Sequence, residues 1–311
     1  MRIIDAEAVA ASLTPEPLVN ALERMFREGC TAPVRHHHTV GVPAAADATL
    51  LLMPAWREGE YLGTKIATIF PGNADRGLPS VSAGYLLMDG RSGAVLALID
   101  GAELTAKRTA ATSALAARYL ARPDAQSLLL VGTGRIAGAL ARFHAALRPG
   151  LERLLVWGRS AAHADELARA LAAEGLPAAR ADDLAAAVAA SDVISSATLA
   201  TEPLIRGDWV QPGTHVDLVG GYTPSMREAD DALIQKARVF ADTRDGALRE
   251  AGDLVAPVAR GILDAASVVD LHGLCGGGGR GRSSAREITV FKSVGAALED
   301  LAAAILVYES T

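Results

Sequence analysis

The chain has 311 residues, of which half are apolar and about a fifth are charged, and its formal net charge is −6. This length is enough for one large core or for two domains, and we expect two. The balance is acidic and no run of like charges occurs. The sequence therefore excludes an electrostatic footprint for nucleic acid or for an anionic membrane surface.

Signals for membranes and secretion are missing too, and we expect a cytoplasmic protein. No window approaches the ~20 apolar residues of a spanning helix, and the first residues lack the pattern of a secretory signal. Cys30 and Cys275 are isolated, without the spacing of a metal or redox site. We expect buried or idle thiols. The Gly-rich segment 275–282 lacks the GKS or GKT of a P-loop and is expected to be a mobile surface loop.

The first hundred residues predict a meandering sheet. Short β-like runs at 49–56, 61–70, 82–89 and 94–100 are separated by Gly and Pro turn signals. Residues 15–29 place Leu18, Leu22, Met25 and Phe26 on one helical face, and we expect this helix to cover the sheet. From about Thr105 the sequence becomes an Ala-rich helix that ends before Pro123.

After Pro123, continuous apolar strands alternate with helices. Such strands, separated by helices, are typical of a parallel sheet covered on both faces. We place this doubly wound domain at 113–287, a smaller α+β domain at 1–112, and a C-terminal segment at 288–311 whose helix returns to the first domain. The strands are expected within 127–134, 153–160, 192–198, 215–221 and 238–243.

The motif GTGRIAG follows the first of these strands and opens a helix. In a Rossmann-type domain Gly132 makes the tight turn, Gly134 lets the backbone approach the pyrophosphate, and Ala137 allows close helix packing. The helix N-terminus adds N–H donors and partial positive charge. A plain Gly-rich turn is the alternative. The expected cofactor-binding run is Gly132, Thr133, Gly134, Arg135, Ile136 and Ala137.

The end of the next strand indicates which cofactor is preferred. Chains that prefer NAD usually carry Asp or Glu there, whereas those that prefer NADP carry Arg and Ser. Here the strand runs into Gly158, Arg159 and Ser160. The sequence therefore favours NADP(H) over NAD(H). A solvated loop position for Arg159 is the alternative.

The run from 63 to 117 resembles the signature region of the ornithine cyclodeaminase and mu-crystallin family. It holds a lysine, FPGN, GLP and RTAA in that order. The GTG loop with its following W-x-R-S, and the C-terminal FKSVGAALEDLAAA, are also similar to the family. The resemblance covers nearly the whole chain.

The resemblance implies a cofactor domain beside a substrate domain that also forms a homodimer, with a small imino or amino acid as substrate. It implies that Arg35 and Arg108 clamp the substrate carboxylate and that Lys65 faces the nitrogen-bearing carbon. The residue chemistry agrees, because a guanidinium fork suits a carboxylate. A lysine near two arginines should have a lowered pKa and can exchange a proton. A surface salt bridge is the alternative for each.

Two positions depart from the ornithine-specific members of the family. Those members carry one acid where this chain has Leu51, and a second where it has Tyr222. A cyclodeaminase needs carboxylates to hold a distal ammonium, so their loss counts against that activity. The GYTP-x-MRE sequence resembles members that reduce cyclic ketimines, with Tyr222 near the substrate. A purely structural Tyr222 is the alternative.

The leading hypothesis is an NAD(P)H-dependent imine (ketimine) reductase or amino-acid dehydrogenase that acts on a small cyclic imino acid such as 1-pyrroline-2-carboxylate. The first alternative is ornithine cyclodeamination, which converts L-ornithine to L-proline and ammonia with NAD. The second is a non-catalytic, mu-crystallin-like binding protein. Retention of Lys65, Arg35 and Arg108 argues against this last alternative.

Other polar residues rank lower. His36, His37 and His38 are adjacent, so in a strand they alternate faces and cannot all ligate one metal. We expect no metal site. Asp217 and Asp230 are expected to cap or pair rather than to catalyse.

Overall fold

The computed structural model describes residues 1–311, except for the side chains of residues 74 and 75. The chain divides into an N-terminal unit, Met1–Arg108 with Ala296–Thr311, and a second unit, Thr109–Gly295. The sequence placed these divisions after residues 112 and 287.

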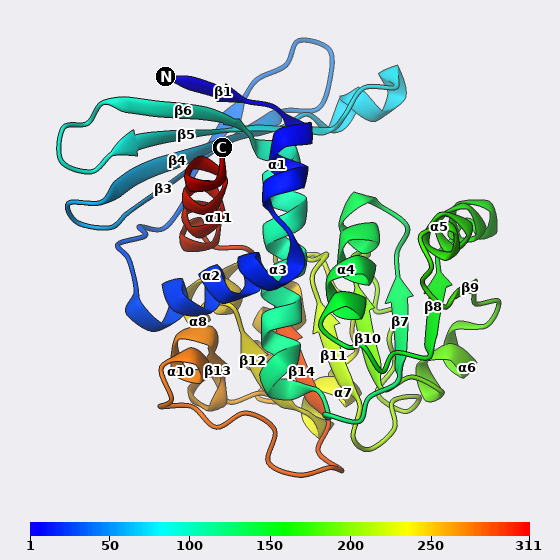
Figure 1. Ribbon diagram of the computed structural model, residues 1–311. Coiled ribbons are helices and arrows are strands. Elements are labelled where there is room, and N and C mark those ends of the chain that lie inside the picture. The colour runs from blue at the N-terminus through cyan, green and yellow to red at the C-terminus, as the bar shows by residue number, and fades with distance from the viewer. The chain divides into compact units, whose positions relative to one another are not determined.

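The N-terminal unit is built on a mixed sheet with the strand order β1-β6-β5-β4-β3-β2 (Figure 1). β1 runs parallel to β6, and the other neighbours are antiparallel. The four runs predicted as strands are confirmed as β3 to β6. The elements of this unit are β1 (Arg2–Ile4), α1 (Ala6–Ser12), α2 (Pro15–Glu28), β2 (His36–Val40), β3 (Ala48–Trp56), β4 (Tyr61–Ile69), a 3-10 turn η1 (Pro71–Arg76), β5 (Val81–Asp89), β6 (Val95–Asp100) and α11 (Ala297–Ser310).

The sheet is covered by α11, and the prediction that α2 is its cover needs correction. α11 contacts β3, β4 and β5, and α2 packs against α11. The apolar face of α2 is buried as predicted, at Leu18, Leu22, Met25 and Phe26. The segment Ala297–Ala304 is buried on all sides, and a helix buried all round lies inside a core rather than at its surface.

The second unit is a doubly wound parallel sheet with the order β13-β12-β14-β11-β10-β7-β8-β9. The predicted Rossmann-type α/β fold is confirmed. The helix α3 (Gly101–Leu120) leads into this unit. Its other elements are β7 (Ser127–Val131), α4 (Arg135–Ala146), β8 (Arg153–Trp157), α5 (Ala161–Ala173), β9 (Ala178–Arg180), α6 (Leu184–Ala189), β10 (Val193–Ser196), β11 (His215–Leu218), α7 (Asp231–Lys236), β12 (Arg238–Ala241), α8 (Arg244–Glu250), α9 (Gly252–Ala259), a 3-10 turn η2 (Ala265–Ser267), β13 (Val269–Asp270), α10 (Leu271–Cys275) and β14 (Thr289–Lys292).

Both faces of the parallel sheet are covered, which explains why its strands are apolar without alternation. Every residue of β7 is buried. Leu129 and Val131 pack in a core with residues of α6 and α7. Leu128 and Leu130 point to the opposite face and are equally buried, and α4 packs against β7.

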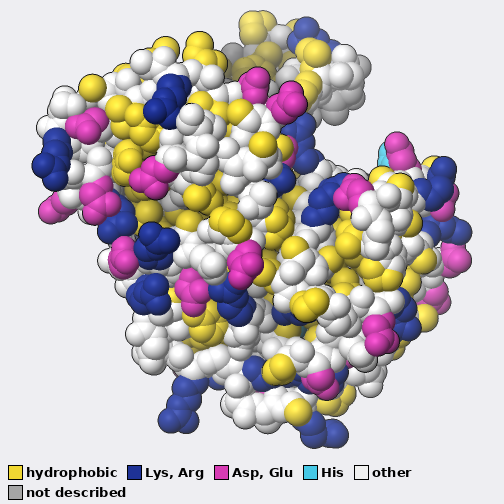
Figure 2. All heavy atoms as spheres, viewed as in Figure 1, with side chains coloured by type: hydrophobic (Ala, Val, Ile, Leu, Met, Phe, Trp, Pro, Cys, Tyr) yellow, Lys and Arg dark blue, Asp and Glu magenta, His cyan; other side chains and the backbone are white. Residues whose placement is uncertain are grey.

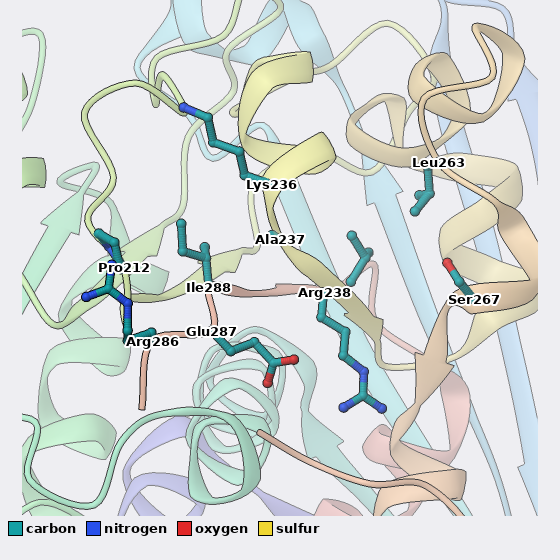
Figure 3. Close-up of a pocket in the computed structure, with 10 residues that line it drawn as sticks. Pro212, Lys236, Ala237, Arg238, Leu263, Ser267, Arg286, Glu287 and Ile288 are labelled. Carbon is teal, nitrogen blue, oxygen red and sulfur yellow. The ribbon is translucent and has the colours of Figure 1, made fainter. Parts of the chain in front are cut away.

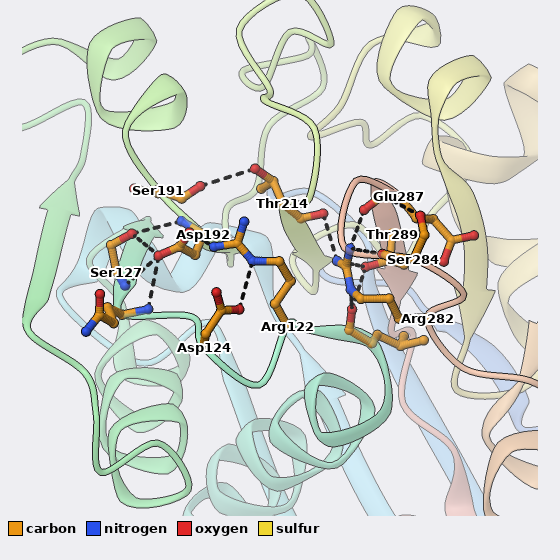
Figure 4. A network of polar contacts seen from close by, with 12 residues as sticks. Arg122, Asp124, Ser127, Ser191, Asp192, Thr214, Arg282, Ser284, Glu287 and Thr289 are labelled. Carbon is orange, nitrogen blue, oxygen red and sulfur yellow. Dashed lines mark hydrogen bonds and ion pairs between the residues drawn. The ribbon is translucent and has the colours of Figure 1, made fainter.

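A polar network lies at the amino ends of the central strands β7, β10, β11 and β14 (Figure 4). Asp192, just before β10, accepts hydrogen bonds from the Ser127 backbone N–H at 3.0 Å and from an Arg122 NH2 at 2.6 Å. Arg282 donates to the Leu120 carbonyl at 2.6 Å and to Thr289 Oγ1 at 3.1 Å. The prediction of a mobile loop at 275–282 is therefore wrong for its last residue, because Arg282 is hydrogen-bonded to α3 and β14.

The surface in Figure 2 carries Lys and Arg side chains interspersed with Asp and Glu, and that face shows no large area of one sign. None of the described helices combines the length and apolar character needed to cross a membrane. Neither cysteine is in a disulfide, and Cys275 is buried. Burial raises the pKa of the Cys30 thiol to about 11, which keeps it protonated and unreactive.

Candidate active site

The glycine loop lies where the strand order of the parallel sheet reverses. The chain goes from β7 outward to β8 and β9 and returns to β10 on the other side of β7. The loops after β7 and β10 therefore face each other at the carboxyl ends of these strands. Ligands of doubly wound sheets bind at this place.

The backbone of the loop requires glycine at its first position. Gly132 has a φ of 121°, and a Cβ there would lie 2.5 Å from the carbonyl oxygen of Ala197. Gly134 is the N-cap of α4, and a Cβ there would meet no described atom within 4 Å. Ala137 is buried, with 1% exposure. The loop thus offers the N-terminus of α4 to a pyrophosphate, which fits a dinucleotide. Thr133, Arg135 and Ile136 complete the loop and the first helical turn.

The loop after β8 is packed against the glycine loop. A Cβ on Gly158 would lie 2.6 Å from Cγ2 of Thr133. Arg159 is exposed. Ser160 is the N-cap of α5, and its Oγ accepts a hydrogen bond from the N–H of His163 at 3.3 Å. Arg159 is therefore the cation that this loop presents at its surface.

Lys65 sits in the middle of the other sheet. In β4 it is paired with Met53 of β3 and with Tyr85 of β5, so the three side chains share one face. Lys65 is 4% exposed, and Arg108 of α3 is 5% exposed. The alternative of a surface ion pair is wrong for Lys65 and for Arg108, because both cations are buried.

Two adjacent carboxylates of α11 hold these cations. The Lys65 Nζ lies 3.0 Å from Oδ1 and 2.8 Å from Oδ2 of Asp300. Arg108 Nε donates to Asp300 Oδ1 at 2.9 Å, and an Arg108 NH1 donates to Glu299 Oε2 at 2.6 Å. Both acids are 0% exposed. The cluster contains two cations and two anions.

The surroundings of Lys65 bring its pKa close to neutral pH. Burial lowers the pKa from 10.5 to about 8, and the Arg108 charge acts in the same direction. The charges of Asp300 and Glu299 oppose this change but do not cancel it. Burial and the Asp300 charge raise the pKa of Tyr85 well above its ordinary value. Lys65 is thus the group in this cluster that can exchange a proton near neutral pH.

Arg35 lies on the same sheet as Lys65. It directly precedes β2, in which His36 pairs with Leu52 of β3. The pairing with β3 is irregular just before β2, because Thr31 pairs with Trp56 in a register shifted by one residue from that of β2. Arg35 is half-buried. Arg35 therefore lies at the start of β2, and β2 is two strands away from β4, the strand that carries Lys65.

The chain is similar to known proteins over nearly its whole length. The family model for the ornithine cyclodeaminase/mu-crystallin family matches residues 2–311. The chain belongs to this family. A Δ1-pyrroline-2-carboxylate reductase of Paracoccus denitrificans is 44% identical over 89% of this chain and 87% of that protein. The ketimine reductase mu-crystallin of Rattus norvegicus is 35% identical over 97% and 93%.

A solved structure has the same fold as this chain. The Δ1-pyrroline-2-carboxylate reductase of Thermococcus litoralis, solved with NADH and L-proline, superposes with a TM-score of 0.93 at 32% identity. The match covers 99% of this chain and 97% of that one. The NADH bound in that structure accords with the glycine loop described above.

Tyr222 lies in the loop after β11, in the same unit as the glycine loop, and is half-buried. That loop is held by Glu228, which is 0% exposed. Its carboxylate accepts hydrogen bonds from Ser196 Oγ at 2.6 Å and from the Gly220 N–H at 2.7 Å. Glu228 thus ties the turn before Tyr222 to the end of β10.

A cavity of about 580 Å³ lies elsewhere in the second unit (Figure 3). Arg238 and Ile288, at the amino ends of β12 and β14, line it together with Leu263 and Glu287. Because dinucleotides bind outside the carboxyl ends of the strands, this cavity is not the cofactor site.

Sequence reasoning missed Glu299 and Asp300. The available signal was a pair of adjacent acids in the first turn of a helix that is otherwise apolar. Asp217 and Asp230 do pair and cap as expected. Asp217 lies 2.7 Å from His215 Nε2, and Asp230 accepts from the Leu233 N–H at the start of α7. Among the described residues, no group of three or more His, Cys, Asp or Glu is placed to hold a metal.

Proposed function

We propose that this chain is an NAD(P)H-dependent ketimine reductase that acts on a small cyclic imino acid such as 1-pyrroline-2-carboxylate. The observation that carries the proposal is the buried Lys65, whose pKa of about 8 suits proton exchange near neutral pH. The glycine loop and the relatives named as reductases support it. The overall reaction adds one proton and one hydride to the C=N bond and yields the cyclic amino acid.

The residues take separate parts in this reaction. When bound, the reduced nicotinamide supplies the hydride. Gly132, Gly134 and the N-terminus of α4 hold its pyrophosphate. Arg35 and Arg108 bind the substrate carboxylate, and Lys65 donates the proton to the imine nitrogen. Tyr222 lies near the substrate ring.

The apolar residue at position 51 favours reduction over ornithine cyclodeamination. Leu51 and Met53 are both buried in β3, and they point to the same face because they are two residues apart. That face is the one that carries Lys65. A diamine would bring its distal ammonium to a buried leucine without a carboxylate to pair with it, which is costly. A cyclic imine has no such charge.

We propose further that the enzyme prefers NADPH to NADH. Residues 157–160, at the end of β8, contain no carboxylate, and Arg159 is exposed. A guanidinium suits a 2′-phosphate, whereas a ribose 2′-hydroxyl is usually bound by a carboxylate.

We also propose a homodimer that forms through the open face of the N-terminal sheet. Ile3, Ile66 and Leu98 on β1, β4 and β6 are 77%, 43% and 42% exposed. Leu98 pairs with Ile3, and Ile66 points away from the face that carries Lys65. A second copy of the chain would cover this apolar face.

A substrate panel tests the activity. The protein is incubated with NADPH or NADH and with 1-pyrroline-2-carboxylate, piperideine-2-carboxylate, or pyruvate with methylamine, and separately with L-ornithine and NAD+. We expect consumption of reduced cofactor with a cyclic imino acid, faster with NADPH, and formation of the amino acid. Proline and ammonia from ornithine without imine reduction would overturn the proposal. So would binding of cofactor without turnover of any substrate.

A further inference from the structure

The first turn of α11 contains an unusual pair of charges. Glu299 and Asp300 are adjacent in sequence, and both are 0% exposed. A buried carboxylate is costly unless it is paired and hydrogen-bonded. Neighbouring positions of this helix are Ala and Leu, so the two acids are the charged exception in an apolar part of the helix. Their position near the helix N-terminus is favourable for anions.

The two acids have different partners. Asp300 contacts both cations, with Oδ1 at 3.0 Å from Lys65 Nζ and at 2.9 Å from Arg108 Nε. Glu299 contacts Arg108, with its Oε2 at 2.6 Å from an Arg108 NH1. Asp300 therefore links the proton-exchanging lysine to the arginine, whereas Glu299 holds the arginine from its other end.

We propose that Asp300 is a positioning residue for the reaction: it fixes the ammonium of Lys65 and sets the pH range in which that lysine is protonated. The inference rests on the proposed function of Lys65. Glu299 orients Arg108 and has a smaller influence on the lysine.

The charged groups around Lys65 determine the direction of the effect. They are Asp300 and Glu299 on α11, Arg108 on α3, and the neutral phenol of Tyr85 on β5. Burial and Arg108 lower the pKa of Lys65, and the leading cause that raises it is the charge of Asp300. If the charge of Asp300 is removed, burial and Arg108 still lower the pKa of Lys65. Lys65 would then be uncharged over most of the pH range around 7.

Removing the charge of Asp300 should change the rates of imine reduction and of amino-acid oxidation in opposite ways. Imine reduction needs protonated Lys65 as the donor, so neutral lysine slows it at and above neutral pH. Oxidation of the amino acid needs neutral Lys65 as the acceptor, so its activity extends to lower pH. A residue with a merely structural role would slow both directions at every pH.

The small number of lysines makes a direct measurement feasible. The chain has four, Lys65, Lys107, Lys236 and Lys292, so 13Cε-lysine labelling gives few NMR resonances and Lys65→Met assigns the one of interest. The Lys65 resonance is titrated in the wild type, in Asp300→Asn and in Glu299→Gln, without substrate or cofactor. The matched control Glu299→Gln removes the neighbouring charge from the same helical turn.

We expect the wild-type Lys65 to titrate near pH 8. Asp300→Asn should lower this pKa by about 1 to 3 pH units, the usual effect of an opposite charge within 4 Å, and Glu299→Gln should lower it less. An unchanged pKa in Asp300→Asn, or an equal change in both variants, would overturn the proposal. This result is independent of the substrate panel, so failure of the proposed function would be recognised separately.

A second variant covers the case in which Asp300→Asn does not fold. Asp300→Glu keeps the charge but moves the carboxylate by one methylene. It should leave the Lys65 pKa close to the wild-type value and reduce kcat of imine reduction by about 10- to 100-fold, because the lysine is misplaced. An unchanged kcat would contradict the positioning role.

Discussion

The two units each contain a buried cluster of charged or titratable groups, and the clusters differ in what they can do. In the second unit, Asp217 lies 2.8 Å from His144 Nε2 and 2.7 Å from His215 Nε2. His215 Nδ1 is 2.9 Å from Thr289 Oγ1. This cluster joins α4, β11 and β14. In the N-terminal unit the cluster around Lys65 joins β4, α3 and α11.

The difference lies in the protonation of the groups near neutral pH. Burial lowers the pKa of His215, and the two histidines hold the pKa of the Asp217 carboxyl below its usual range. Both shifts move the pKa values of these groups away from neutral pH. The pKa of Lys65, about 8, is close to it. Equal burial therefore produces a structural cluster in one unit and a cluster able to transfer a proton in the other.

Removing Lys65 should give the largest effect on activity. Lys65→Met should reduce kcat for imine reduction by about 100- to 10,000-fold, the usual contribution of a positioned proton donor. Cofactor affinity, measured by nicotinamide fluorescence, should be unchanged because the glycine loop belongs to the other unit. Lys236→Met, at an exposed lysine, serves as the control. Near-normal turnover in Lys65→Met would contradict a role for the N-terminal cluster in proton transfer.

Replacing Asp217 should affect stability rather than chemistry. Asp217→Asn removes the charge that both histidines face, and hydrogen bonds to charged groups contribute about 1.5–3 kcal/mol. We expect a loss of unfolding free energy of about that size in urea denaturation, with the Lys65 titration unchanged. If the variant were as stable as the wild type, the second cluster would not hold α4 and the sheet together.

The titration of His215 and Asp217 should determine how the free energy of unfolding depends on pH below neutrality. His215 has a lowered pKa in the folded state, so below about pH 6.5 the unfolded chain binds more protons than the folded one. The contribution of His215 to the free energy of unfolding is therefore full above that pH and is lost as the pH falls. The lowered pKa of Asp217 extends the loss to more acidic pH. Thermal melting measured from about pH 8 downward should show a falling midpoint, and a midpoint that rises on acidification would contradict this sign.

The smallest effect is expected at the surface of the cofactor loop. Arg159→Ala should weaken NADPH binding by about 10-fold, the value of one charge-assisted hydrogen bond, and should leave NADH binding nearly unchanged. Fluorescence titration with both cofactors measures this. Equal loss for NADH and NADPH would show that Arg159 does not contact the 2′-phosphate.

The parts of the fold that could be predicted are those encoded in contiguous sequence. The strand before Gly132 and the helix after it depend on neighbouring residues, and their places agree with the prediction. The partners of Lys65 could not be found this way, because Asp300 is 235 residues away along the chain. β2 was not predicted because its exposed sequence, HHHTV, shows no apolar alternation.

The covering role of α11 was missed for a related reason. Leu298 and Leu301 lie on an apolar face of α11, but the small residues Ala302, Ala303 and Ala304 are buried as well. Alanines do not mark a face in the sequence pattern. Their burial depends on how closely α2 and the sheet approach the helix, which is tertiary information.

Deuterium transfer tests the central claim most directly. The protein is given 1-pyrroline-2-carboxylate and NADPH deuterated at the transferable position of nicotinamide C4, and the product is analysed by mass spectrometry and NMR. The account predicts proline that carries one deuterium at C2, formed at a rate that falls as Lys65 loses its proton above about pH 8. Proline without deuterium, or no proline from the imine while L-ornithine and NAD+ yield it, would contradict the account.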